Sequence, residues 1–257
     1  MPAVALTIAG SDPSGGAGIQ ADLKTFQTFG AYGEAVITLI TVQNTRSVTR
    51  VETLPADLVI QQIEAVLDDI PPQAAKTGAL GNEEIVEAVA ALAQSFAFPL
   101  VVDPVMISKH GARLLSEAAE AVLKEQLLPY ASLVTPNIPE AEALTGMHVA
   151  TEDDMIEAAR RILDFGCEAV LVKGGHRAGD ATDVFVSRHD VKHLQGPRVA
   201  TQHTHGTGCT YSAAITAGLA NGQRLVDAVR LSKRFIQRAI ESAPGLGHGC
   251  GPVGILR

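Results

Sequence analysis

Short runs of β-branched and other apolar residues alternate along the chain with longer segments in which apolar residues recur every three or four positions. The first pattern is typical of buried strands and the second of amphipathic helices. The predicted strands cover residues 4–10, 36–43, 74–79, 99–105, 131–137 and 168–175. Because these strands are almost continuously apolar and helices separate them, the pattern predicts a parallel sheet covered by helices on both faces.

The predicted helices occupy the intervals between these strands and the C-terminal part of the chain. They are expected over residues 19–29, about 55–68, from about 82, 116–128, 138–144, 151–166, about 207–221 and about 225–243. The helix over 151–166 has the clearest signals, because Thr151 can cap its first turn and Gly166 can end it. Residues 182–196 instead favour an antiparallel hairpin or edge.

Nothing in the sequence divides the chain into separate units. It has no internal repeat, no low-complexity run and no Pro- or Gly-rich linker. The prediction is one domain over residues 1–257, an α/β three-layer α/β/α sandwich with a mostly parallel central sheet. In such sheets ligands bind beyond the carboxyl ends of the strands, so residues that directly follow a strand are the candidates for function.

Composition narrows the function classes. Apolar residues make up 46% of the 257 residues and charged residues 19%, with a formal net charge of −8. That charge argues against nucleic-acid binding. No segment reaches the roughly 18 apolar residues of a membrane span, and no signal peptide is expected. The three cysteines fit neither a disulfide framework nor a zinc site, so a cytoplasmic location is expected.

A first glycine-rich segment, residues 10–21, follows the first predicted strand. Gly16, Gly18 and Ala21 match the dinucleotide-binding fingerprint in spacing alone, but the second strand does not end in the acid that this fingerprint needs. No GK[ST] sequence is present, which excludes a Walker A loop. The segment is either a tight turn into a helix, or a turn whose amides, with Asp12 and Asp22, contact a ligand.

A second glycine-rich segment, residues 203–215, opens a helix after RVAT (198–201), which resembles a strand. Gly206, Thr207 and Gly208 would place backbone N–H groups at the helix N-terminus, forming an anion hole suited to a phosphoryl group. Cys209 lies in the first turn, where the same field is expected to lower the pKa of the thiol. The alternative is a small cysteine packed under a turn.

Further charged residues follow other predicted strands. Asp103 and Lys173 each end a strand, and Glu140 comes three residues after Asn137. Singly, these have structural explanations, such as a turn or a first-turn acid. Together, two acids and a lysine beside an anion hole are the groups that Mg²⁺-assisted phosphoryl transfer requires.

His203 and His205 could be mistaken for a metal pair, but no third ligand has suitable spacing. We interpret both as turn and ligand-contact residues.

Seven segments, in order along nearly the whole chain, resemble the hydroxymethylpyrimidine/phosphomethylpyrimidine kinases of the ribokinase-like superfamily. They are TIAGSDPSGGAGIQADLKTF (7–26), VITLITVQNT (36–45), KTGAL (76–80), VVDPVM (101–106), TPNIPEAEAL (135–144), LVKGGH (171–176) and HTHGTGCT (203–210). The resemblance implies a ribokinase-like fold and two successive ATP-dependent steps of thiamine biosynthesis, from alcohol to monophosphate and on to the diphosphate.

The resemblance also implies roles for individual residues. Asp22 and Gln43 would hold the aminopyrimidine, and Cys209 would stand at the catalytic-base position beside the anion hole of Gly206, Thr207 and Gly208.

Four further residues would serve the phosphates. Asn137 and Glu140 would organise Mg²⁺, while Asp103 and Lys173 would face the metal and the nucleotide phosphates. Most ribokinase-like enzymes carry Asp at the position of Cys209, whereas the pyrimidine-kinase branch is similar to this chain in having Cys.

The expected cofactors are ATP and Mg²⁺, with K⁺ as a possible addition. The expected partner is a small aminopyrimidine alcohol and its monophosphate, with no nucleic acid and no membrane, and a homodimer is the expected assembly. Two alternatives stay open: a pyridoxal or pyridoxine kinase on the same fold, and a binding protein that sequesters thiamine precursors without catalysis.

Overall fold

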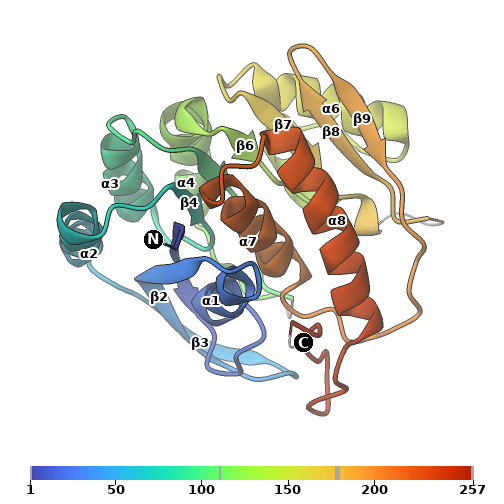
Figure 1. Ribbon diagram of the computed structural model, residues 1–257, viewed down its shortest axis with the longest axis horizontal. Helices are drawn as coiled ribbons and strands as arrows, with labels where there is room; N and C mark the ends of the chain where they lie inside the picture. The colour runs from blue at the N-terminus through green and yellow to red at the C-terminus, as the bar shows by residue number, and fades with distance from the viewer. Residues whose placement is uncertain (1, 110, 177–179, 256–257) are drawn as a thin grey trace.

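The computed structural model describes residues 2–109, 111–176 and 180–255, in which nine strands form one sheet (Figure 1). The strands lie in the order β3-β2-β1-β4-β5-β6-β7-β8-β9. Their bounds are β1 Val4–Ser11, β2 Tyr32–Gln43, β3 Val48–Thr53, β4 Ala74–Thr77, β5 Leu100–Val102, β6 Leu133–Val134, β7 Ala169–Val172, β8 Asp183–Ser187 and β9 Val191–Leu194.

Helices cover both faces of this sheet, so the predicted three-layer α/β/α fold is confirmed. α1 (Gly18–Thr28), α7 (Thr207–Ala220) and α8 (Leu225–Glu241) pack on one face (Figure 1). The opposite face carries α2 (Ala56–Asp69), α3 (Glu83–Ala93), α4 (Glu117–Val122), α5 (Ile138–Thr145) and α6 (Glu152–Leu163). Each layer buries an apolar cluster against the sheet, and the burial of apolar area is the main term that stabilises the fold.

The centre of the sheet is parallel and its two edges are antiparallel. β2, β1, β4, β5, β6 and β7 run in one direction, as the continuous apolar runs predicted. The predicted hairpin over 182–196 is confirmed as β8 and β9, which add antiparallel to β7. No helix in the described part of the chain is long and apolar enough to cross a membrane.

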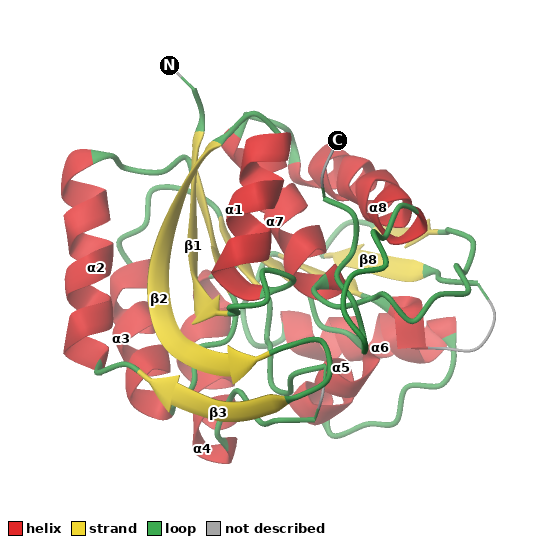
Figure 2. Cartoon of the chain, turned by 90° about the horizontal axis from the view of Figure 1, so that it is seen from below, coloured by secondary structure: helices red, strands yellow, loops and turns green. Residues whose placement is uncertain are grey.

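β3 was not predicted from the apolar pattern. It pairs antiparallel with β2, which is long and curved and turns into it (Figure 2). Its sequence alternates, and Arg50 and Glu52 point to solvent, so it lacks the continuous apolar run of the central strands. The turn before it was a usable signal, because the Asn44 side chain accepts hydrogen bonds from the N–H groups of Arg46 and Ser47.

Two other expectations were wrong in detail. RVAT (198–201) is not a strand, because it pairs with no strand edge among the described residues and instead forms a local turn in which the Thr201 N–H donates to the Val199 carbonyl. The segment predicted as one helix over 116–128 is helical but not a single α-helix. The α-helical part, α4, ends at Val122, and a π-helical turn, Leu123–Leu127, and a 3₁₀ turn, Leu128–Tyr130, follow it directly.

The chain reverses its winding direction at β1. From β1 it passes through α1 to β2 on one side, and it returns through α2 to β4 on the other side of β1. The loop after β1 therefore lies at a topological switch point, where open α/β sheets bind ligands. This places residues 10–18 at one wall of any site at this edge.

Candidate active site

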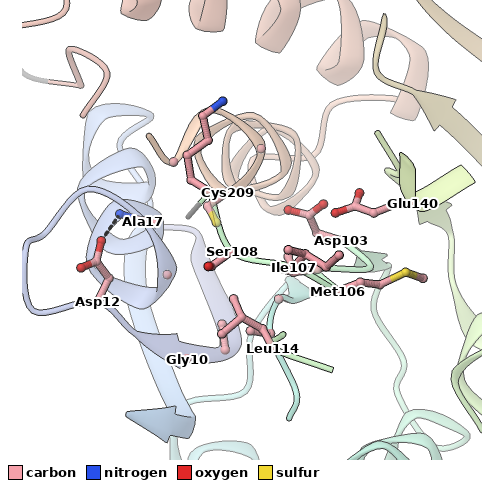
Figure 3. Close-up of a pocket in the computed structure, with 18 of the residues that line it drawn as sticks. Gly10, Asp12, Ala17, Asp103, Met106, Ile107, Ser108, Leu114, Glu140 and Cys209 are labelled. Carbon is pink, nitrogen blue, oxygen red and sulfur yellow. Dashed lines mark hydrogen bonds between the residues drawn. The ribbon is translucent and has the colours of Figure 1, made fainter. Parts of the chain in front are cut away.

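A cavity of about 760 Å³ opens at the carboxyl edge of the sheet (Figure 3). The loop after β1, the end of β2, residues 103–109 and 113–114, and the first turns of α5 and α7 supply its walls. In the view of Figure 3, Asp12 lies on one side, Asp103 and Glu140 lie on the other, and Cys209 lies between them. This size suits a small ligand together with part of a second one.

The N-terminus of α7 forms one end of the cavity. Its N-cap is Gly206, whose φ of +75° is a conformation that glycine adopts readily. A side chain there would also collide with the carbonyl oxygen of Gly16. The backbone N–H groups of Gly208 and Cys209 meet no acceptor within the described residues. Two unsatisfied donors and the positive end of the helix dipole therefore face the cavity, as an anion hole requires.

Cys209 lies at this helix end, but the expected lowering of its thiol pKa was wrong. Burial raises the pKa of Cys209 to about 11, and the ammonium of Lys76 only partly offsets this effect. Desolvation disfavours a thiolate more than the helix terminus favours it here. The thiol is therefore mostly protonated at neutral pH, and it must first lose this proton before the sulfur can act as a base.

Asp103 and Lys173 meet where β5 and β7 end. Lys173 Nζ lies 2.9 Å from Asp103 Oδ1, and the hydroxyls of Thr135 and Ser212 also donate to this carboxylate. Burial alone would raise the pKa of Asp103, but the charges of Lys173 and Lys76 and the hydrogen bonds from Lys173 and Ser212 outweigh burial and lower this pKa. A Cβ on Gly208 would lie 3.2 Å from Lys173 Nζ, so the bare helix turn lets the ammonium lie against the anion hole.

Asn137 and Glu140 form the capping box of α5. The Asn137 side chain accepts from the Glu140 N–H at 2.9 Å, and Glu140 Oε2 accepts from the Asn137 N–H at 2.8 Å. Glu140 is 7% exposed, and burial raises the pKa of its carboxyl to about 7, against the opposing effect of Lys173. Both residues line the cavity, so the same contacts that begin the helix aim a poorly solvated carboxylate at the site.

The structure places Asp22 away from the cavity lining. Its side chain is completely buried, pairs with Lys76 Nζ at 2.9 Å and accepts a 2.7 Å hydrogen bond from Thr7. Direct contact with a substrate would require this pair to open. Lys76 lies behind the cavity floor, because its Nζ is 3.8 Å from the position a Cβ on Gly78 would take.

Gln43 does line the cavity, and it contacts His205 and, through His205, Asp12, two residues that the sequence offered only as ligand-contact candidates without a role. His205 Nε2 lies 2.9 Å from Gln43 Nε2 and 2.8 Å from Asp12 Oδ2. Asp12 also accepts from the backbone N–H of Ala17 within its own loop, and its contact with His205 joins this loop to the segment that precedes α7. The sequence carried a signal for both, since each lies in a glycine-rich segment after a strand, but only the fold brings residues so far apart in sequence into contact.

The donor set on the Asp103 side fits a divalent cation. Mg²⁺ takes oxygen ligands and binds through one or two carboxylates together with water and substrate phosphates. Asp103 and Glu140 supply two carboxylates beside Lys173, and the described residues contain no cluster of three or more His, Cys, Asp or Glu. These two carboxylates fit a cation that would be held together with water and substrate phosphates better than they fit an all-protein metal cage.

Comparison with known proteins decides the family. Residues 12–254 match the family model described as phosphomethylpyrimidine kinase. A hydroxymethylpyrimidine/phosphomethylpyrimidine kinase of Streptomyces coelicolor is 47% identical over 252 residues, which are 98% of this chain and 94% of that protein. The chain belongs to the phosphomethylpyrimidine kinase family. The family resemblance and the assignment as a kinase are thereby confirmed.

A longer relative contains a matching region. The thiamine biosynthesis bifunctional protein ThiED of Geobacter sulfurreducens is 49% identical over 250 residues, which are 96% of this chain. Those residues span 51% of that relative.

Solved structures show that the fold of the phosphomethylpyrimidine kinase family is shared with pyridoxal kinases. A phosphomethylpyrimidine kinase from Clostridium difficile is 47% identical, with a TM-score of 0.83, over 93% of this chain and 99% of that chain. The ADP complex of Bacillus subtilis pyridoxal kinase is 39% identical, with a TM-score of 0.92, over 98% and 97% of the two chains. Backbone similarity alone therefore does not separate the two substrates, which leaves the choice to the side chains of the site.

Proposed function

We propose that this chain transfers the γ-phosphoryl group of ATP to the hydroxymethyl group of 4-amino-5-hydroxymethyl-2-methylpyrimidine, and then phosphorylates the monophosphate to the diphosphate. The observation that carries the proposal is the α7 N-terminus. Its free N–H groups at Gly208 and Cys209 face the same cavity as Lys173, Asp103 and Glu140. Preorganised donors of this kind stabilise the charge that develops on a transferring phosphoryl group.

The nucleotide would lie on the Lys173 side of the cavity. Solved pyridoxal kinases of Staphylococcus aureus, 36% identical to this chain, hold ADP or AMP-PCP, which supports a nucleotide as the phosphate donor. In the proposed arrangement Lys173 neutralises phosphate charge, while Asn137 keeps Glu140 aimed at the phosphates.

Asp103 and Glu140 would hold Mg²⁺ through their carboxylates and bound water. The cation, when bound, supplies charge neutralisation between the donor and acceptor phosphates. K⁺ is a further possible ion, but no group of residues in the described part of the chain identifies a site for it.

Gln43 is the proposed contact for the aminopyrimidine. A carboxamide can donate to a ring nitrogen and accept from an exocyclic amine at the same time. Asp22, being enclosed with Lys76, acts indirectly in this proposal by supporting the cavity floor. The thiolate form of Cys209 would accept the proton of the substrate alcohol during transfer.

Both phosphorylations are assigned to one site. The sequence contains one GTGC segment, at residues 206–209, and no internal repeat. The second acceptor is a phosphate monoester, which already carries negative charge at neutral pH. Its main barrier is repulsion between phosphates, which Lys173 and the helix terminus would reduce.

A pyridoxal kinase is the second candidate, and the high structural similarity to pyridoxal kinases favours testing it. An ATP-coupled assay with the pyrimidine alcohol and with pyridoxal separates the two by kcat/KM. We expect the pyrimidine to be preferred, and a preference for pyridoxal would replace the proposed substrate. A chain that binds the pyrimidine but transfers no phosphate would be a sequestering protein.

Three further expectations belong to the same proposal. The chain is expected to function as one domain over residues 1–257, as a homodimer, and in the cytoplasm. Sedimentation velocity of the purified chain tests the assembly, since a dimer should have about twice the 26.8 kDa mass of the chain.

A further inference from the structure

A buried row of polar side chains leads from the loop after β1 to the cavity. Asp12 and His205 are each 3% exposed, and Gln43 lies at the cavity wall. A single ring nitrogen, His205 Nε2, lies 2.8 Å from Asp12 Oδ2 and 2.9 Å from Gln43 Nε2. Whether that nitrogen carries a proton decides what both neighbours can do.

The contact with Asp12 determines which nitrogen of the His205 ring carries the hydrogen. The carboxylate of Asp12 accepts hydrogen bonds from the backbone N–H groups of Ser14, Gly16 and Ala17. Burial alone would raise the pKa of Asp12, but the hydrogen bonds from His205 and Ser14 outweigh burial and lower it. A carboxylate has no proton to offer, so the contact with His205 is a hydrogen bond only if Nε2 carries the hydrogen. A bare Nε2 at that distance would set two acceptors against each other.

The protonated Nε2 in turn restricts Gln43. An N–H group cannot make a hydrogen bond to the –NH₂ of a carboxamide, because both are donors. The carboxamide keeps its shape when its oxygen and nitrogen exchange places, so a half-turn of the group resolves the conflict. Oε1 then shares the single Nε2–H of His205 with Asp12 Oδ2 as a second acceptor, and the –NH₂ group is directed away from this contact.

We propose that Asp12 and His205 are positioning residues for substrate recognition, which lock the Gln43 carboxamide with Oε1 toward His205. Gln43 then presents two groups to the cavity in a fixed arrangement: the acceptor Oε1 next to His205, and the –NH₂ donor farther from it. A ligand must match this arrangement with an amine facing Oε1 and an unprotonated ring nitrogen facing the N–H group. The inference rests on the proposed function, since it specifies how the aminopyrimidine is oriented.

The first test needs no substrate. Long-range ¹H–¹⁵N spectra of the full chain identify which nitrogen of each imidazole is protonated, and the spectrum of His205→Gln assigns the His205 signals. We expect Nε2 to carry the proton. A His205 ring with a bare Nε2 and its proton on Nδ1 would overturn the inference, whatever the chain phosphorylates.

The second test asks whether His205 acts through Gln43. The dissociation constant of the pyrimidine alcohol is measured by calorimetry for His205→Leu, Gln43→Ala and the double variant. Each single change should weaken binding by about 10-fold, the usual scale of a lost buried hydrogen bond. The double variant should bind no more weakly than Gln43→Ala alone, because coupled residues are not additive. Additive losses, about 100-fold in the double variant, would contradict the inference.

Rescue and kinetics distinguish positioning from folding. His205→Gln keeps an N–H donor near the place of Nε2, so it should restore pyrimidine binding to within about 3-fold of the unmodified chain. The pyrimidine KM should rise in His205→Leu while the KM for ATP stays unchanged. His193→Leu is the matched control, because it removes a histidine that contacts a carboxylate, Glu152, outside the cavity lining.

Two outcomes of these kinetics would assign His205 a purely structural role. One is equal loss of binding in the Leu and Gln variants of His205, and the other is a parallel rise in the KM for ATP. Turnover of the pyrimidine by the unmodified chain tests the proposed function separately.

Discussion

Replacing Cys209 by alanine tests whether this side chain removes the proton of the substrate alcohol. The cavity raises the pKa of this thiol to about 11. Because pH 7 lies about four pH units below this pKa, roughly one molecule in 10⁴ carries a thiolate at Cys209. If this thiolate removes the proton of the substrate alcohol, the rate of the first phosphorylation should rise by about tenfold per pH unit from pH 6.5 to 9.

The second phosphorylation should not show this slope. The monophosphate needs no proton removed from an alcohol, so its rate should stay nearly flat above the second pKa of a phosphate ester, about 6. Cys209→Ala should accordingly lose about 10²–10⁴-fold in kcat when it starts from the alcohol. Starting from the monophosphate, it should lose less than about 10-fold.

The assay follows ADP release under single-step conditions, separately from the alcohol and from the monophosphate. The ATP affinity and the melting temperature of the variant serve as controls for folding. If both steps fall by the same factor, Cys209 supports the anion hole structurally and is not a base for the alcohol. A flat pH profile for the first step in the unmodified chain would equally refute a thiolate base.

Three further changes have defined outcomes. Glu140→Gln should lower activity severely and raise the Mg²⁺ concentration needed for half-maximal rate in a magnesium titration; an unchanged requirement would remove Glu140 from the metal site. Gly208→Ala should lower kcat about 10-fold with little change in melting temperature, because its Cβ would press on Lys173 Nζ, and unaltered kinetics would show that the ammonium is free to shift. Burial and, to a smaller extent, the charge of Asp69 raise the pKa of Glu34 to about 7. The contribution of this shift to the free energy of unfolding is therefore complete below the pKa of the unfolded chain, about 4.5, and is lost as pH rises through 7. Melting curves at pH 5 and pH 8 should therefore show a smaller pH-dependent loss of stability for Glu34→Gln than for the unmodified chain, and equal losses would refute the assignment.

Much of the fold could be predicted because the central strands are almost purely apolar. Most positions of these parallel strands are apolar, although β4 also buries Lys76 and Thr77. Thr151 caps its helix as predicted, with its side chain accepting from the Asp154 N–H. β3 was missed because an edge strand needs only one buried face. The strand predicted over RVAT (198–201) was wrong for a different reason, since a short segment of this kind forms a strand only where a neighbouring strand offers partners.

In the candidate site, the sequence predicted those residues that directly follow a parallel strand. Asp103 and Lys173 lie in contact because parallel strands deliver their last residues to the same edge. The pKa of Cys209 could not be predicted, because the helix terminus is visible in the sequence whereas the burial that outweighs it is not. The enclosure of Asp22 by Lys76 depends likewise on two strands and a helix meeting in space.

The central claim is that one cavity carries out two successive phosphate transfers to a pyrimidine. The most direct measurement is a ³¹P NMR time course of the purified chain with the pyrimidine alcohol, ATP and Mg²⁺. We predict that the monophosphate signal rises first and then declines as a diphosphate pair replaces it, with two ADP formed per pyrimidine. A reaction that stops at the monophosphate with ATP still present, or one that leaves the pyrimidine untouched while pyridoxal is phosphorylated, would contradict the account.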